Sequence, residues 1–319
     1  MSNGIRPVIT RFRGYQLGSA GSSFSYFANG NFTLIEARAT DTSKPQLLAE
    51  LKACGKTTIN TLHITSWDKD HCSVPGLEWI LKGLLPSRIE VPGYLPYTES
   101  GKTCAAMIRE YRNRWIAQGH TVTTQAIDPP YLETLGSAEP LGYKEILYHP
   151  KILREKANDN STIKFFRTGA FNVLSLGDVE HPDIAALLKR CKTLCREVDV
   201  MILAHHGADN GFTTKRLLSE LSPTLAICSS NYDNKFVHPR QEIRDLLYQQ
   251  EIPLFTTKTG DVVIQSIGGH TMDYHVTNLC SDSTKISSTN QFRSRKSKLL
   301  LMNTDTIRNV LHPGFKGLR

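Results

Sequence analysis

The sequence lacks long apolar runs, closely paired cysteines and an apolar leader. No stretch approaches the roughly 20 apolar residues that a membrane-spanning helix needs, and the first residues, 1–7, contain no apolar core of a signal peptide. The seven cysteines are an odd number, and Cys191 and Cys195 are not in a C-x-x-C arrangement. We therefore expect reduced thiols, a cytoplasmic location and no membrane association.

The sequence also lacks any RNP, zinc-finger or helix-turn-helix signature of sequence-specific nucleic-acid binding. Its 319 residues, 39% of them hydrophobic and 21% charged, are enough for one large domain or two ordinary ones. The net charge of +8 is uneven: residues 281–319 contain eight Lys or Arg against two Asp, a net +6. This predicts a basic C-terminal tail, which either contacts phosphates or is only solvated.

Strands alternate with helices along the chain. Extended apolar segments separated by a small-residue turn at 18–22 occupy residues 8–37, and helix-start signals follow at Ser43 and at Ser73 with Pro75. Residues 85–145 are less regular, apart from a helical stripe of Cys104, Ile108, Tyr111 and Trp115. The alternation predicts an α/β (α+β) protein, with sheets covered by helices rather than a helical bundle.

Four apolar strands each stop at residues that commonly bind metals. These residues are Asp68, Asp70 and His71 after the strand at 60–64, then His149, then Asp178, and then His205 and His206. Packing gives buried strands no reason to end repeatedly in His or Asp. A divalent metal centre of one or two ions at one edge of the sheets explains all four strand ends together.

In this order, these residues resemble the metallo-β-lactamase superfamily, and within it the hydrolase domain of ComEC-type DNA-uptake competence proteins. The matching segments are the turn at 18–21, Leu34-Ile35-Glu36, the loop 65–71, His149-Pro150 with 158–161, Gly177-Asp178, His205-His206-Gly207, and the loop 231–239. The resemblance runs from about residue 8 to 267. It implies a hydrolase domain at 1–277, with a divergent or inserted segment at 85–145, and the basic tail at 278–319.

The resemblance implies a four-layer αββα sandwich with the metal site at one edge. One metal position would take Asp70, His71, Asp178 and one of His205 or His206. The other would take Asp68 and His149 together with Asp178. Ser66 stands where the family pattern opens with histidine, so this second position lacks one donor and is expected to bind its ion weakly or only with substrate. The oxygen-rich ligand set shifts the preference from Zn²⁺ towards Mn²⁺ or a mixed population.

The leading functional hypothesis is metal-assisted hydrolysis of a phosphodiester in DNA or RNA. Asp70 would hold the metal and orient a water as general base. His238 would contact the phosphate or protonate the leaving oxygen, or else is only a turn residue before proline, and Lys235 and Arg240 beside it add positive charge.

Two rival hypotheses stay open. The substrate could be small, such as a cyclic nucleotide, a phosphonate ester or a lactone, because one fold hosts many chemistries. The protein could instead be a catalytically degenerate, metal-containing nucleic-acid-binding module, which the loss of a histidine at Ser66 suggests. A protein partner is compatible with each hypothesis, and the sequence names none.

Overall fold

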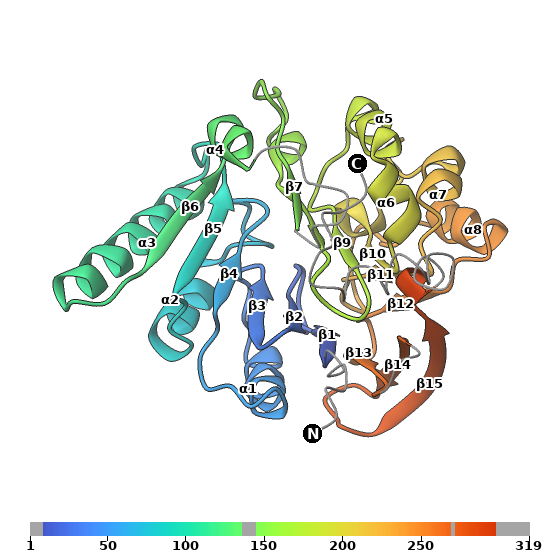
Figure 1. Ribbon diagram of the computed structural model, residues 1–319, viewed down its shortest axis with the longest axis horizontal. Coiled ribbons are helices and arrows are strands. Elements are labelled where there is room, and N and C mark those ends of the chain that lie inside the picture. Colours follow the sequence, from blue (N-terminus) through green and yellow to red (C-terminus); the bar gives the residue numbers. More distant parts are fainter. Residues whose placement is uncertain (1–8, 136–144, 269–271, 298–319) are drawn as a thin grey trace, which may run out of the picture.

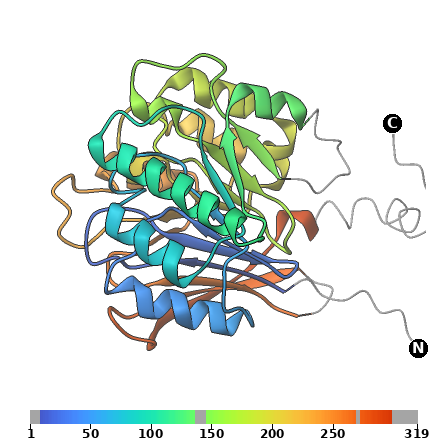
Figure 2. The same ribbon diagram turned by 90° about the vertical axis from the view of Figure 1, so that its left-hand side faces the viewer.

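Two β-sheets pack face to face, and helices cover the outer face of each. The structure is a computed structural model that describes residues 9–135, 145–268 and 272–297. Figure 1 shows α1, α2 and α3 on the outer side of one sheet and α5 to α8 on the outer side of the other, and the turned view in Figure 2 shows the same layers. The four-layer αββα sandwich predicted from the sequence is confirmed.

The first sheet has nine strands in the order β15-β14-β13-β1-β2-β3-β4-β5-β6. Its strands are β1 (Thr10–Gly14), β2 (Phe24–Ala28), β3 (Asn31–Ile35), β4 (Thr61–His63), β5 (Arg88–Pro92), β6 (Thr123–Ile127), β13 (Val262–Ser266), β14 (Asp273–Leu279) and β15 (Ile286–Arg293). From β3 to β6 the strands are parallel, and the remaining pairs are antiparallel.

The second sheet has six strands in the order β12-β11-β10-β9-β8-β7. These are β7 (Ile146–Tyr148), β8 (Ile163–Phe166), β9 (Val173–Ser175), β10 (Val200–Ile202), β11 (Leu225–Cys228) and β12 (Leu254–Thr256), with short 3₁₀ helices η1 (Ala157–Asn160) and η2 (Ala204–Gly207). Strands β9 to β12 are parallel, whereas β7 and β8 are antiparallel to their neighbours. Each sheet therefore has a parallel part, whose strands end in loops at the same edge.

The eight helices in the described residues are α1 (Ser43–Ala53), α2 (Val74–Gly83), α3 (Glu99–Ala117), α4 (Pro129–Thr134), α5 (Pro182–Arg190), α6 (Lys192–Glu197), α7 (Lys215–Leu221) and α8 (Gln241–Gln249). Five of them, α2, α3, α4, α5 and α7, begin at a residue whose side chain caps them. Ser73 caps α2, because its side chain accepts a hydrogen bond from the backbone N–H of Gly76, and Pro75 lies in the first turn. In α3, the predicted stripe of Cys104, Ile108 and Tyr111 is buried.

Three apolar layers hold the sandwich together. One lies between α1 to α3 and the first sheet, and includes Leu47, Leu77 and Ile108. The second lies between α5 to α8 and the second sheet, and the third lies between the two sheets. Because the second sheet is covered on both sides, its parallel strands β9 to β12 are mostly apolar in the sequence. The parallel strands β4 to β6 of the first sheet also contain polar residues.

Regular secondary structure extends into two regions that the sequence left as a tail or as a less regular segment. Strand β14 runs across the expected boundary between residues 277 and 278, and β15 extends the first sheet further, so the sheet includes the start of the supposed tail. Strand β15 is mostly polar and exposed, which left no apolar alternation to reveal it. Within 85–145, β5 and β6 continue the first sheet and α3 and α4 accompany them. Residues 136–144 and 298–319 lie outside the described part.

No helix in the described ranges is long and apolar enough to cross a membrane. All seven cysteines lie in these ranges, and each is a free thiol, as expected for reduced cysteines.

Candidate metal centre

Four side chains from three loops converge at the carboxyl ends of the parallel strands. Asp70 and His71 follow β4, Asp178 follows β9, and His206 follows β10; their ligand atoms all lie within 4.8 Å of one another. His71 Nε2 lies 2.8 Å from Asp178 Oδ2, and His206 Nε2 lies 3.4 Å from Asp70 Oδ2. Two carboxylates and two imidazoles form a donor set suited to a divalent transition metal.

Both imidazoles are held so that one nitrogen faces the carboxylates. His71 Nδ1 lies 3.1 Å from Glu36 Oε1, and His206 Nδ1 lies 3.0 Å from the carbonyl oxygen of Ser229. An acceptor at Nδ1 fixes the tautomer that leaves a lone pair at Nε2, as in metal-ligating histidines. The Nε2 atoms of His71 and His206 are buried, and they face the carboxylates of Asp178 and Asp70. Two buried imidazole nitrogens that face two carboxylates fit a divalent cation.

The imidazoles and carboxylates of the group shift one another's pKa values. Burial lowers the pKa of His71, but the carboxylates of Asp178 and Glu36 outweigh it and hold that pKa well above its usual range. Burial raises the pKa of Asp70, but His206 and His71 outweigh burial and hold the pKa below its usual range. Since a metal ligand must be deprotonated, a cation would take the place of the protons on the imidazoles.

The backbone around the group is tightly constrained. Gly21 has φ +133°, and a Cβ there would lie 2.5 Å from the carbonyl oxygen of Asp70, so only glycine permits this approach. His205 and His206 have φ of 46° and 53°, and the N–H of His205 donates to the carbonyl oxygen of Gly177. Positive φ in adjacent non-glycine residues costs free energy and persists only where the surrounding structure enforces it. This bond joins the loop after β10 to the turn before Asp178.

A small recess opens beside Asp70 and His206. Its volume is about 80 Å³, and it is lined by Ala20, Gly21, Asp70, His205, His206, Ser229, Ser230, Asn231, Asn234, Phe236 and His238. The ring of His238 lies nearly parallel to that of His206, with centroids 6.3 Å apart. Burial, followed by the charges of His206 and His205, lowers the pKa of His238 to about 4. His238 is therefore a neutral imidazole at the mouth of the site near pH 7.

The other predicted ligands lie outside the four-donor group. The backbone N–H of Asp68 donates to the hydroxyl of Ser66, and burial and the charge of Asp70 raise the pKa of the Asp68 carboxyl. The Ser66 hydroxyl is buried and lies 3.2 Å from the hydroxyl of Tyr94.

Of the two adjacent histidines, His206 joins the group. His205 Nδ1 instead lies 2.7 Å from Glu180 Oε1. The structure therefore brings together four of the seven predicted ligands, and their binding of metal stays a prediction.

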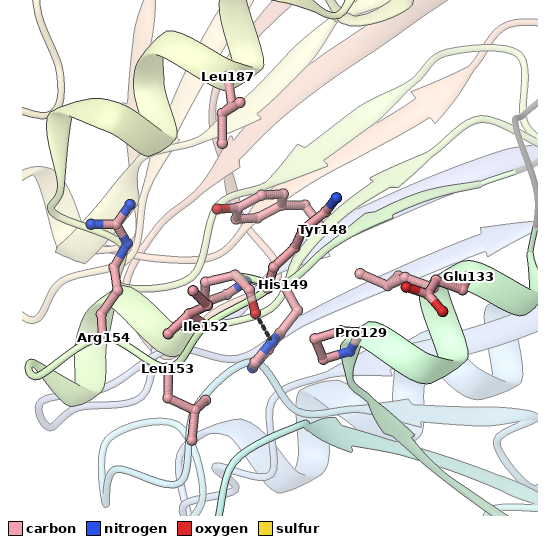
Figure 3. Close-up of a pocket in the computed structure, with 11 residues that line it drawn as sticks. Pro129, Glu133, Tyr148, His149, Ile152, Leu153, Arg154 and Leu187 are labelled. Carbon is pink, nitrogen blue, oxygen red and sulfur yellow. Dashed lines mark hydrogen bonds between the residues drawn. The ribbon is translucent and has the colours of Figure 1, made fainter.

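His149 lies beside a different cavity. Its Nδ1 donates to the carbonyl oxygen of Pro150, and its buried Nε2 makes no hydrogen bond. Figure 3 shows this bond and places His149 next to Tyr148, Ile152 and Leu153, in the lining of a cavity of about 770 Å³. The free Nε2 keeps His149 available as a ligand, but it does not converge with the other four donors.

Sequence reasoning gave Glu36 no role in the site. Its carboxylate accepts hydrogen bonds from the backbone N–H and the hydroxyl of Thr65, and it lies beside His71 Nδ1. It therefore orients a candidate metal ligand and the loop that carries it. The signal was present in the sequence, since Glu36 follows the apolar end of β3 just as the ligands follow other strands.

Two face-to-face mixed sheets between helical layers, with a His/Asp group at the carboxyl ends of their parallel strands, define the metallo-β-lactamase fold. The chain has this fold and a candidate metal site. It is also a distant relative of ComE operon protein 3 of Bacillus subtilis (strain 168), with which it shares 24% identity over 218 residues. The match covers 66% of this chain and 25% of that protein. The predicted resemblance is confirmed, although no family model matches the chain.

Two solved structures are similar in fold. One is the metallo-beta-lactamase fold protein YhfI from Bacillus subtilis, with a TM-score of 0.46 and 11% identity over 81% of this chain and 100% of that chain. Another is Tm1679, a metal-dependent hydrolase of the beta-lactamase superfamily, with a TM-score of 0.47 and 13% identity over 77% of this chain and 95% of that chain. These likenesses concern the fold alone.

Proposed function

We propose that this protein is a metal-dependent hydrolase of phosphodiesters that acts on DNA or RNA. The observation that carries the proposal is the group of Asp70, His71, Asp178 and His206, two of which, Asp70 and His206, line an open recess. A divalent cation held by these four residues would supply Lewis acidity towards a phosphoryl oxygen and towards the attacking water. The oxygen and nitrogen donors suit Mn²⁺ or Zn²⁺.

Asp70 and His238 have the clearest roles in handling the substrate. The depressed pKa of Asp70 keeps its carboxylate ionised, so that it accepts a hydrogen bond from the attacking water as well as serving as a ligand. His238 lines the recess together with Asp70 and His206. As a neutral imidazole it can donate an N–H to a phosphoryl or leaving oxygen.

The charge of the protein and the sequence resemblance support a nucleic-acid substrate. A net charge of +8 attracts polyanions, and Lys235 and Arg240 lie next to the recess on an exposed loop. The resemblance to the hydrolase domain of DNA-uptake competence proteins points to the same class of substrate. A recess of about 80 Å³ is also compatible with a small ester, so the assay must include one.

The experiment is a cleavage assay on single- and double-stranded DNA and RNA and on a small model diester. It compares EDTA-treated wild type, the same protein resupplied with Mn²⁺ or Zn²⁺, and the double variant Asp70→Ala/His71→Ala. His181→Ala serves as a matched control, because His181 is a partly exposed histidine outside the four-donor group. We expect metal-restored cleavage of nucleic acid by wild type and by the control variant, and none by the double variant.

Each other outcome contradicts a defined part of the proposal. Cleavage of the small diester alone would replace the nucleic-acid substrate with a small molecule. Metal binding without any cleavage would favour the non-catalytic binding module.

A further inference from the structure

The recess beside Asp70 and His206 is lined mainly by polar and small residues, which suit a phosphoryl group. Phe236 is the only large apolar side chain among the described lining residues, so it is the candidate surface for the base attached to that group.

Phe236 continues a column of rings that starts at the metal group. His206 and His238 lie at an interplanar angle of 10°, and Phe236 lies at 21° to His238 with ring centroids 5.6 Å apart. The Phe236 side chain is 57% exposed, although phenylalanine is normally buried. The column thus ends in an accessible aromatic surface, the ring of Phe236, next to His238, which lines the recess.

The loop that carries Phe236 is shaped by its own hydrogen bonds. The Asn234 side chain accepts from the backbone N–H of His238 and donates to the carbonyl oxygens of Asn231 and His238. These hydrogen bonds fix the turn that carries the exposed Phe236 ring. Lys235 Nζ lies 4.9 Å from the centroid of the Phe236 ring, so a positive charge accompanies the aromatic surface.

We propose that Phe236 stacks on the nucleobase next to the phosphate held in the recess, and that Lys235 contacts a flanking phosphate. An aromatic surface beside a cation is the usual platform for bases whose faces are accessible, as in single strands. The inference rests on the proposed function and adds a binding residue to it. It requires the bound nucleotide to be unpaired.

Phe236 lies against the His238 ring, so its loss could weaken binding only by displacing His238. The test therefore separates stacking on a nucleobase from this indirect effect. Binding of fluorescein-labelled phosphorothioate oligothymidylate to the Mn²⁺-loaded protein is measured by anisotropy, alongside an abasic oligomer of the same length and phosphate number. The variants are Phe236→Leu and, as a matched control, Tyr248→Leu. Tyr248 is 85% exposed on α8 and does not line the recess.

Stacking predicts that Phe236→Leu weakens oligothymidylate binding about 5- to 150-fold. It also predicts unchanged abasic binding and no effect of Tyr248→Leu.

Two results would overturn the inference. Equal weakening for both oligomers would mean that Phe236 acts only by holding His238. Unchanged binding of both would mean that Phe236 does not contact the substrate. The cleavage assay on wild type distinguishes these failures from failure of the proposed function: if wild type cleaves nucleic acid while either result holds, only the stacking inference is lost.

Discussion

The two metal positions suggested by the sequence are built differently by the fold. At the first, Asp70, His71, Asp178 and His206 place their ligand atoms within 4.8 Å of one another, and acceptors at Nδ1 orient both imidazoles. At the second, Asp68 and His149 lie outside this group. Ser66, in place of a histidine, is buried and bonded to Tyr94.

This contrast teaches that residue type and position after a strand are necessary for a metal ligand but not sufficient. The side chains must also converge, and a second layer of hydrogen bonds must hold them there. We therefore expect one tightly bound ion per chain, at the first position.

Removal of a first-position ligand should have the largest effect. His71→Ala deletes a buried imidazole that faces Asp178, so we expect metal content to fall from about one ion per chain to near zero and affinity to fall by more than about 100-fold. Metal analysis after dialysis measures this change, with circular dichroism to confirm folding and His181→Ala as the control. Retention of metal by the folded variant would show that His71 is not a ligand of the tightly bound ion.

Loss of the residue that orients His71 should have the next largest effect. Glu36→Gln keeps the shape of the side chain but removes the charge that faces His71 Nδ1. We expect metal affinity to fall about 10- to 100-fold. Competition with a fluorescent chelator measures the affinity. Glu50→Gln is the matched control, because Glu50 is equally buried but pairs with Arg11 and Arg13. The control should lower thermal stability and leave affinity unchanged; an equal loss of affinity in both variants would argue against a specific role for Glu36.

Acid should weaken metal binding at the first position. The pKa values of His71 and His206 are raised above their usual range, mainly because Asp178 and Asp70 outweigh the effect of burial. Metal must displace these protons, so affinity should be greatest at high pH and fall as pH decreases through the raised pKa values. The expected slope is about tenfold per pH unit for each proton released. Chelator competition between about pH 6 and pH 9 gives the slope, and a flat profile would show that the imidazoles are not ligands.

Changes at the second position should have the smallest effect. We expect Asp68→Asn and His149→Ala to change the affinity for the tight ion less than about threefold, or about 0.6 kcal/mol, because neither side chain belongs to the four-donor group. The same chelator assay applies. A loss comparable to that of His71→Ala would show that both positions form one cooperative centre.

Much of the fold could be predicted from the sequence because the parallel strands of the second sheet are mostly apolar and several helices carry clear caps or apolar stripes. Ser73 with Pro75 marks the start of α2, and the stripe of Cys104, Ile108 and Tyr111 marks α3. The end of β14 and the whole of β15 were placed in a tail instead, because β15 is polar and exposed and pairs at the sheet edge without a buried face. Edge strands of this kind leave no alternating pattern in the sequence.

For the candidate site, the sequence indicated which residues are available but not which of them meet. His205 and His206 are indistinguishable in the sequence, and only the direction of each side chain shows that one faces Glu180 and the other Asp70. Likewise, the role of Glu36 depends on the approach of β3 to the loop after β4, a contact between segments about 30 residues apart. Such convergence is a property of the packed sheets.

The most direct test of the central claim is the number of ions bound per chain. Metal-free wild type is titrated with Mn²⁺ and with Zn²⁺ by calorimetry, beside Asp178→Asn, and the bound ion is counted by elemental analysis. The account predicts one tight ion per wild-type chain and severely weakened binding in the variant. Two equally tight ions, or one ion of unchanged affinity in Asp178→Asn, would contradict it.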